Sequence, residues 1–163
     1  MTPLRRWLAT LPVAAVVLSG WQAAKAPEQP IPYSHRTHIA LGLECRNCHT
    51  NPDPGEVMGI PKASVCMGCH QTVKKDSPHI QKLATFAQSR REIPWVRVYQ
   101  IPAYVRFSHR EHLATGATCA TCHGEVKTRD VLWREANIHM GGCMECHLKN
   151  QASNDCSFCH EPK

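Results

Sequence analysis

The sequence predicts a small, mostly irregular fold with a few short α-helices, compact and internally duplicated. Three observations predict it. All ten cysteines fall in five copies of Cys-x-x-Cys-His, one stretch of the chain is repeated, and only 6% of the 163 residues are aromatic. The motif is the one that attaches haem c covalently. Because so few large apolar side chains cannot fill a protein-only core, we expect a multihaem cytochrome c organised around stacked haems.

The first 26 residues are typical of an export leader. Two arginines form a short basic n-region, and the 18 residues of the segment 7–24 carry no charge. Residues 24–26 have the small-x-small form of a cleavage site, but Pro27 directly after them should hinder cleavage. We therefore expect an uncleaved membrane anchor, with a cleaved signal peptide as the alternative. In both cases the rest of the chain is exported, and it lies anchored at the periplasmic face of the cytoplasmic membrane or soluble in the periplasm.

A Pro-rich tether, residues 27–32, leads to the haem domain, residues 33–163. Within this domain the segment from Tyr33 to His49 aligns without a gap on the segment from Phe107 to His123. The half-repeats span about residues 33–75 and 107–150, and each contains two motifs. The fifth motif, residues 156–160, follows the second half.

The connection between the halves predicts one helix and one extended segment. Ser77 is a candidate N-cap before a proline, and apolar residues at helical spacing predict a helix that ends near Arg90. The stretch 93–102 has proline near both ends and predicts an extended segment. Its Trp95 and Tyr99 could cover a haem edge, or the segment could be a plain linker.

The motif spacing explains how each haem is attached. Two cysteines three positions apart can each form a thioether to the same porphyrin, and the histidine that follows can bind the iron. Structural zinc and redox dithiols also use Cys-x-x-Cys, but neither needs a histidine after every pair. The sequence therefore predicts five covalent haem c groups. The attachment residues are Cys45, Cys48, Cys66, Cys69, Cys119, Cys122, Cys143, Cys146, Cys156 and Cys159, and the proximal iron ligands are His49, His70, His123, His147 and His160.

The remaining histidines and one methionine are candidates for the opposite face of the irons. His-x-x-His precedes the first motif of each half, so we expect the first histidine of each pair to serve the haem directly downstream and the second to serve a neighbouring haem. These four expected ligands are His35, His38, His109 and His112. For the fifth iron Met140 is favoured, because two glycines follow it and a thioether ligand would raise the potential. His139 is the next choice, and His79 is the expected bystander.

The charge balance argues against nucleic-acid binding. Of the 19 basic residues three lie in the leader, which leaves 16 against 13 acidic residues. Each haem would also add two propionates, and no basic stripe interleaved with aromatic residues is present. We expect neither nucleic acid nor a small-molecule substrate as a partner.

Several of these features together resemble the class III (cytochrome c3/c7-like) multihaem cytochrome c family. The Phe107-Ser-His-x-x-His112 unit before Cys-x-x-Cys-His carries the family resemblance. The run Ile93-Pro-Trp-Val-Arg-Val and the later Met140-Gly-Gly-Cys143 are similar to the pentahaem subunit of alternative complex III-type quinol oxidoreductases. The resemblance implies electron transfer between membrane quinol-oxidising or iron–sulfur subunits and a soluble cytochrome c. One departure matters, because cytochrome c3 motifs are followed at once by another histidine and these motifs are not, so the ligand map of that family cannot be carried over.

Three classes of function remain at the level of sequence. The favoured one is pure electron transfer, because enough side chains exist to fill all ten axial positions. Within it, a subunit of a respiratory complex is preferred to a free periplasmic shuttle. The second class is a multihaem reductase with one open haem. The third is a structural role in an extracellular haem filament, against which the expected anchor argues.

Overall fold

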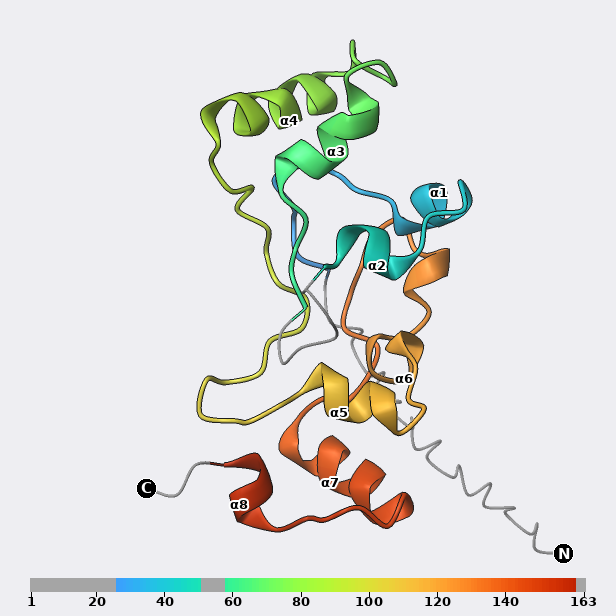
Figure 1. Ribbon diagram of the computed structural model, residues 1–163, viewed down its shortest axis with the longest axis vertical. Helices are drawn as coiled ribbons and strands as arrows, with labels where there is room; N and C mark the ends of the chain where they lie inside the picture. Colours follow the sequence, from blue (N-terminus) through green and yellow to red (C-terminus); the bar gives the residue numbers. More distant parts are fainter. Residues whose placement is uncertain (1–25, 51–57, 161–163) are drawn as a thin grey trace, which may run out of the picture.

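The computed structural model describes residues 26–50 and 58–160, which form an elongated stack of short helices joined by irregular segments (Figure 1). The leader prediction concerns residues outside these ranges, apart from Ala26. Within the described ranges no helix is long and apolar enough to cross a membrane. The helices are α1 His35–Ile39, α2 Cys45–Cys48, α3 Ala63–His70, α4 Pro78–Ser89, α5 His109–Ala114, α6 Cys119–His123, the 3₁₀ helix η1 Val126–Thr128, α7 Met140–Lys149 and α8 Cys156–Cys159.

Most of the molecule is irregular, as the sequence predicted. In the part of the chain that the structure describes, β pairing is limited to one isolated antiparallel bridge between Val105 and His160. The amide of Arg106 reinforces it by donating to the carbonyl of Cys159 at 2.8 Å. This contact fastens α8 to the segment that precedes α5. The prediction of a small, mostly irregular fold with a few short helices is therefore confirmed.

The two halves begin their helices in the same way. Ser34 and Ser108 are the N-caps of α1 and α5, and each hydroxyl accepts a hydrogen bond from the amide three residues later. The motif helices α2 and α6 both begin with a reciprocal cap in which the N-cap amide donates to the side chain three residues on, Asn47 or Thr121. The repeat seen in the sequence thus appears as repeated local structure.

Helix α4 matches the prediction for the connection. It begins at Pro78 and ends at Ser89, with Arg90 in the left-handed conformation as its C-cap. Ser77 occupies the N-cap position, but its side chain makes no capping hydrogen bond. Proline lacks the amide that would otherwise need a partner at the start of the helix, which reduces the need for that bond.

The only cluster of buried apolar side chains among the described residues lies where α3 packs on α4. Ala63 and Leu83 come from these two helices, while Ile31 of the tether and Ile93 of the connection close the cluster. Trp95 packs against it, so this residue supports the end of the molecule built by α3 and α4. The described residues outside this cluster have no comparable protein core, in agreement with the low aromatic content of the sequence.

The connection after α4 runs beside the tether without forming a strand. The side-chain amide of Gln29 donates to the carbonyl of Val96 at 2.8 Å and accepts from its amide at 3.0 Å. This side chain satisfies the backbone of Val96 as a neighbouring strand would. The predicted extended segment is therefore held by a side chain and not by a sheet.

One ion pair joins the two halves. Arg36 on α1 pairs with Asp130, which also accepts a hydrogen bond of 2.6 Å from Ser34. The amide of Arg36 donates to the carbonyl of Arg129 at 3.0 Å. Since both charged side chains are about half exposed, we expect the backbone contact and the Ser34 cap to matter more than the charge attraction.

Candidate haem sites

Every Cys-x-x-Cys pair lies within one helical turn. The second cysteine is three residues after the first, so both thiols lie on one face of α2, α3, α6, α7 or α8. All ten cysteines are free thiols, and each is exposed or half-buried. This geometry presents two thiols side by side to one porphyrin edge, as thioether attachment requires.

In each half the first histidine of His-x-x-His faces the histidine of the following motif. The ring centroids of His35 and His49 are 6.3 Å apart and their planes differ by 7°. Those of His109 and His123 are 6.4 Å apart and differ by 4°. The two halves therefore repeat the same arrangement almost without change.

The second histidine of each pair faces the histidine of the next motif along the chain. The ring centroids of His38 and His70 are 6.1 Å apart, with 61° between the planes. Those of His112 and His147 are 6.0 Å apart, with 39° between the planes. Together the four pairs use four of the five motif histidines.

The spacing of these rings fits an iron between each pair. Imidazole nitrogen binds a transition metal at roughly 2.0–2.1 Å, so two rings on opposite sides of one metal have centroids about 6 to 6.5 Å apart. All four measured distances lie in this range. Two opposed imidazoles would hold one iron between them, and the cysteine pair of the motif would hold the porphyrin around it.

An aromatic residue orients both histidines of each pair. The ring of Tyr33 meets His35 edge-on at 4.8 Å and stacks on His38 at 4.4 Å. Phe107 does the same for His109 at 4.8 Å and His112 at 4.5 Å. One side chain thereby sets the direction of two imidazoles that serve different motifs.

Hydrogen bonds fix which ring nitrogen is available for iron. A carbonyl only accepts, so a histidine whose Nδ1 lies beside one carries its proton there and leaves Nε2 unprotonated. Five of the histidines in the facing pairs have this contact, at 2.7–2.9 Å: His38 to Ser34, His49 to Gly59, His70 to Val73, His112 to Ser108 and His147 to Ser153. In both halves the serine that caps the helix also provides the carbonyl for the second histidine.

Burial keeps the innermost imidazoles neutral. It lowers the pKa of His35 to about 4, with smaller contributions from His49 and His38. Burial also lowers the pKa of His123, with His109 and His49 adding to the effect. A neutral imidazole has the free lone pair that a metal ligand needs.

Neighbouring motifs raise the pKa of one another's thiols, and these interactions give the order of the motifs in space. Burial is the largest cause of each shift. The interacting thiols are Cys66 with Cys48, Cys119 with Cys45, Cys122 with Cys146 and Cys143, and Cys143 with Cys159. The order is thus second, first, third, fourth and fifth motif, which matches α3, α2, α6, α7 and α8 along the long axis (Figure 1).

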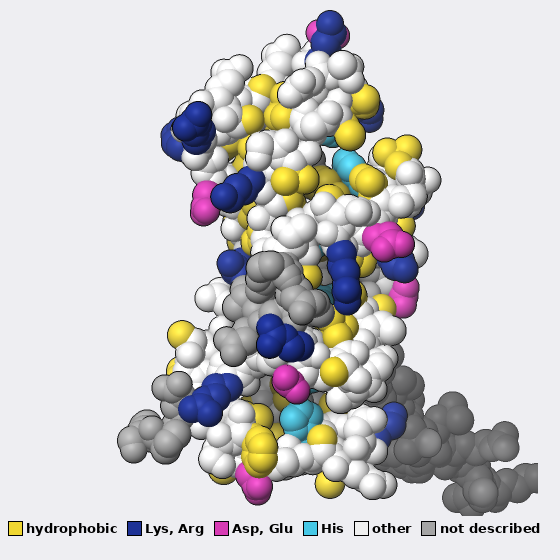
Figure 2. Space-filling view, in the orientation of Figure 1, with side chains coloured by type: hydrophobic (Ala, Val, Ile, Leu, Met, Phe, Trp, Pro, Cys, Tyr) yellow, Lys and Arg dark blue, Asp and Glu magenta, His cyan; other side chains and the backbone are white. Residues whose placement is uncertain are grey.

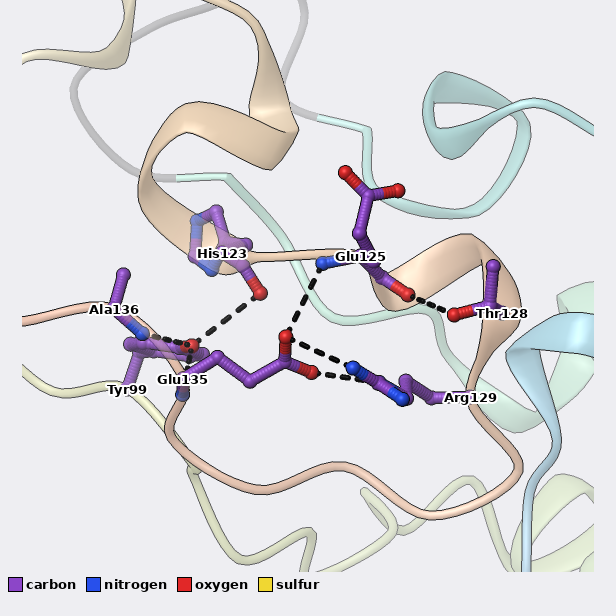
Figure 3. Close-up of polar contacts among 7 residues, drawn as sticks. All are labelled: Tyr99, His123, Glu125, Thr128, Arg129, Glu135 and Ala136. Atoms are coloured by element: carbon purple, nitrogen blue, oxygen red, sulfur yellow. Dashed lines mark hydrogen bonds and ion pairs between the residues drawn. The ribbon is translucent and has the colours of Figure 1, made fainter.

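Tyr99 contacts both the backbone and the imidazole of His123 in the third motif. Its hydroxyl accepts hydrogen bonds from the amides of Glu135 and Ala136, at 2.9 and 3.4 Å, and donates to the carbonyl of His123 at 3.3 Å (Figure 3). Its ring meets the imidazole of His123 edge to face, with ring centroids 4.8 Å apart and 82° between the planes. The residue from the connection therefore positions the motif histidine through both backbone and ring.

A second group of contacts holds the loop that contains Glu135 and Ala136, the two residues that bond to Tyr99. Arg129 pairs with Glu135 at 2.7 Å and stacks over Trp133 at 4.3 Å (Figure 3 shows the ion pair). The guanidinium lowers the pKa of the Glu135 carboxyl. Gly124 has φ +70°, and a β-carbon there would meet the Glu135 side chain at 2.6 Å, so only glycine fits.

Comparison with known proteins agrees with this geometry. The family model of cytochrome c3 matches residues 37–124, more than half of the chain. The chain belongs to the cytochrome c3 family. A second model, cytochrome c7 and related cytochrome c, matches residues 105–161. This cytochrome c3-family protein is also similar to the multiheme cytochrome c subunit of menaquinone reductase from Nitratidesulfovibrio vulgaris. The two are 29% identical over an alignment 182 positions long, which covers 91% of this chain and 86% of that subunit.

Family membership establishes covalent haem c as the cofactor of this protein and confirms the class III prediction.

The fifth motif differs from the other four. His160 faces Tyr104, with ring centroids 6.0 Å apart and 30° between the planes. A phenol oxygen and an imidazole on one iron would need a longer separation, about 7.5 to 8 Å between ring centroids. Tyr104 therefore lies against this site without the geometry of a ligand.

The three candidates for the fifth iron occupy different places. Met140 begins α7, and Cys143 follows it by three residues on the same helix face. His139 is the N-cap of α7, and its Nε2 lies 3.3 Å from Arg134, which can only donate. His79 lies in the first turn of α4, at the opposite end of the molecule (Figure 1).

Sequence reasoning missed the residues that hold the ligands in place. The stacking of Tyr33 and Phe107 had a signal, because an aromatic residue precedes Ser-His-x-x-His in both halves. The sequence named Tyr99 as a residue that could cover a haem edge, but its hydrogen bonds had no signal, and neither had the position of Tyr104, since both depend on loops that approach from distant parts of the chain.

Proposed function

We propose that this cytochrome transfers electrons through five covalently attached haem c groups held in one row. When bound, haem c supplies reversible one-electron redox chemistry at iron. The observation that carries the proposal is the four opposed imidazole pairs with ring separations of 6.0–6.4 Å. A haem iron held between two imidazoles would have no position left for a substrate, so these four sites fit electron transfer better than catalysis.

The fifth site takes His160 and Met140 in this proposal. Met140 shares a helix face with Cys143, and Cys143 is close enough to Cys159 of the fifth motif for the two thiols to interact. The thioether of Met140 thus starts on the side of α7 that meets the fifth motif. His139 is disfavoured because Arg134 donates to its Nε2. A thioether would give this haem a higher potential than those with two imidazoles.

Haem counting combined with one substitution tests the proposal. Intact-mass measurement of the purified protein should find five haem adducts, and the oxidised protein should give only low-spin electron paramagnetic resonance signals. Met140→Ala should convert one haem to high spin and leave the other four unchanged. A count below five would refute the row of five haems, and an unchanged spectrum in the variant would refute Met140 as a ligand.

The physiological setting that we propose is the periplasmic face of the cytoplasmic membrane, as a subunit or direct partner of a quinol-linked respiratory complex. The name of the aligned menaquinone reductase subunit supports this, as does the apolar leader of the sequence. Redox partners would be membrane quinol-oxidising or iron–sulfur subunits on one side and a soluble cytochrome c on the other. Co-purification from detergent-solubilised membranes with polytopic subunits is the expected result, whereas recovery alone in the soluble periplasmic fraction would indicate a free electron shuttle.

One observation favours a second function. Tyr104, not a histidine, faces His160, so an iron bound by His160 would have an open position if Met140 does not bind it. Such a multihaem reductase predicts that the reduced native protein binds carbon monoxide at one haem. A reduced spectrum that carbon monoxide leaves unchanged excludes it.

A further inference from the structure

One histidine of the facing pairs has a buried ring nitrogen without a hydrogen-bond partner. Among the described residues two buried side-chain nitrogens lack a partner, the Nδ1 of His35 and the Nε1 of Trp95. Only His35 belongs to a facing pair, in which its ring lies opposite that of His49. If Nε2 of His35 binds iron, the proton of the ring is on Nδ1, and that N–H has no acceptor.

The facing pairs at the second and fourth motifs differ from this pair. Both histidines of each of those pairs donate from Nδ1 to a backbone carbonyl, at 2.7–2.9 Å. His49, opposite His35, does the same to the carbonyl of Gly59 at 2.9 Å. The first motif therefore combines one imidazole that has an acceptor with one that has none, whereas the second and fourth motifs have two imidazoles with acceptors.

The surroundings of His35 explain why its Nδ1 lacks a partner. The carbonyl of Ser34, the residue directly before it, accepts from the Nδ1 of His38 at 2.7 Å, and the hydroxyl of Ser34 caps α1. Bulk water does not reach the nitrogen, because it is buried. Figure 2 shows only small areas of histidine on the face that it draws, so on this face the histidines lie mostly behind other side chains.

An acceptor at Nδ1 changes how strongly an imidazole binds iron. The acceptor draws the Nδ1 proton away from the ring and raises the basicity of Nε2. A more basic ligand stabilises the ferric state more than the ferrous state, so it lowers the reduction potential. An imidazole without the acceptor is the weaker donor, and the potential at its site stays higher.

We propose that His35, through its unpartnered Nδ1, sets the reduction potential at the first motif above the potentials at the second and fourth motifs. This inference rests on the proposed function, in which His35 and His49 hold one iron. The first motif lies inside the row, where the thiols of Cys45 and Cys119 are neighbours. The site of higher potential therefore lies where the two halves meet.

The first test uses the holoprotein without any substitution. A redox titration followed by proton nuclear magnetic resonance, with the haem methyl signals assigned to each motif, gives one midpoint potential for each site. At equal solution potential, the ratio of reduced to oxidised haem should be roughly tenfold higher at the first motif than at the second or fourth, a difference of about 59 mV. A potential at the first motif equal to or below the other two would overturn the proposal.

A cavity variant isolates the hydrogen bond from other influences on the potential. His35→Gly removes the imidazole of the holoprotein, and 4-methylimidazole or 1-methylimidazole is added to replace it. The methyl group of either isomer can take the place of the histidine β-carbon, so the first isomer puts an N–H at the Nδ1 position and the second puts a C–H there. Because no acceptor lies at this position, the two isomers should bind with affinities within about twofold and give the same potential.

His38→Gly is the matched control, since the Nδ1 of His38 donates to the carbonyl of Ser34. In this variant 4-methylimidazole should bind roughly tenfold more tightly than 1-methylimidazole and give the lower potential. The intrinsic difference in basicity between the isomers is common to both variants and cancels when they are compared. An equal preference for 4-methylimidazole in both variants would overturn the proposal.

The same variants separate failure of this inference from failure of the proposed function. Without added ligand, His35→Gly should convert one haem to high spin. If it does and the isomers differ there as they do in His38→Gly, His35 remains a ligand and electron transfer stands, but this inference falls. If no haem becomes high spin, His35 is no iron ligand, and the opposed imidazoles that carry the proposed function fall together with the inference.

Discussion

At the scale of single residues, the unit that recurs is an aromatic side chain, a capping serine and two histidines. In the second half Phe107 contacts both imidazoles, Ser108 caps the helix with its hydroxyl, and the carbonyl of Ser108 accepts from the Nδ1 of His112. Two consecutive residues, Phe107 and Ser108, thus define where two imidazoles point. His109 and His112 then face motifs on different helices, so one unit joins two haem sites.

Replacing the aromatic ring should disturb two haems and little else. Phe107→Leu removes the contacts to His109 and His112, and we expect broadened or shifted low-spin signals from two of the five proposed haems in electron paramagnetic resonance. The loss of stability should stay below about 1.5 kcal/mol, because the replacement keeps an apolar side chain of similar volume. Phe86→Leu in α4 is the matched control and should leave the haem signals unchanged. A spectrum of Phe107→Leu identical to that of the parent would contradict the orienting role.

The hydroxyl of Tyr99 gives a second prediction. Tyr99→Phe leaves the amides of Glu135 and Ala136 without this acceptor, and because these contacts are exposed or only partly buried, the loss should cost about 0.5–1.5 kcal/mol. We expect a lower melting temperature and a shifted midpoint potential for one haem, both measured on the holoprotein. Tyr104→Phe, at an exposed position, should change stability by less than about 0.5 kcal/mol. Equal effects of the two substitutions would exclude a special role for Tyr99.

At this scale, which contacts the sequence could predict depends on how far apart the contacting residues lie along the chain. The opposition of His35 to His49 was expected because motif and ligand lie in one repeat, and the structure places the rings accordingly. The environment of Tyr99 was out of reach, since its partners lie 24 to 37 positions further along. Their loop is closed by the Arg129–Glu135 ion pair, which only the fold brings beside the connection.

At the scale of elements, α4 is the helix that ordinary sequence rules predicted best. It lies outside the motifs, so capping, proline and apolar spacing decide it, and its bounds agree with the prediction. The motif helices are four to ten residues long and follow the attachment residues more than any periodicity. The connection after α4 was harder to predict, because the sequence did not show that Trp95 packs against the cluster between α3 and α4.

This cluster should be the one part of the protein that responds to an ordinary core substitution. Leu83 is 4% exposed, so Leu83→Ala should destabilise the packing of α4 on α3 by about 2–5 kcal/mol. Hydrogen exchange should accelerate in α4 while the exchange of α6 and α7 and the haem content stay unchanged. Leu148→Ala is the control, since this leucine is 74% exposed. Faster exchange throughout the molecule would show that the end formed by α3 and α4 is not an independent unit.

At the scale of the whole molecule, the order of the motifs follows from the duplication. The second motif lies outside the first, and the fourth lies outside the third, so the two halves meet through their first motifs, where Cys45 lies beside Cys119. The sequence showed that the halves are similar but could not show that they join in this way, because an alignment does not define relative orientation. The contact of Asp130 with Ser34 and Arg36 on α1 also depends on this meeting of the halves.

The same view of the molecule predicts what happens without haem. Only Ile31, Ala63, Leu83 and Ile93 are buried among the described residues, which is far too little apolar burial to offset the loss of chain entropy over the haem domain. A chain made without haem attachment should therefore show no cooperative thermal transition and rapid hydrogen exchange everywhere except, in part, in α3 and α4. The holoprotein, measured in parallel, should unfold cooperatively. A sharp transition in the haem-free chain would mean that protein contacts alone define the fold, and the porphyrins could then not be its core.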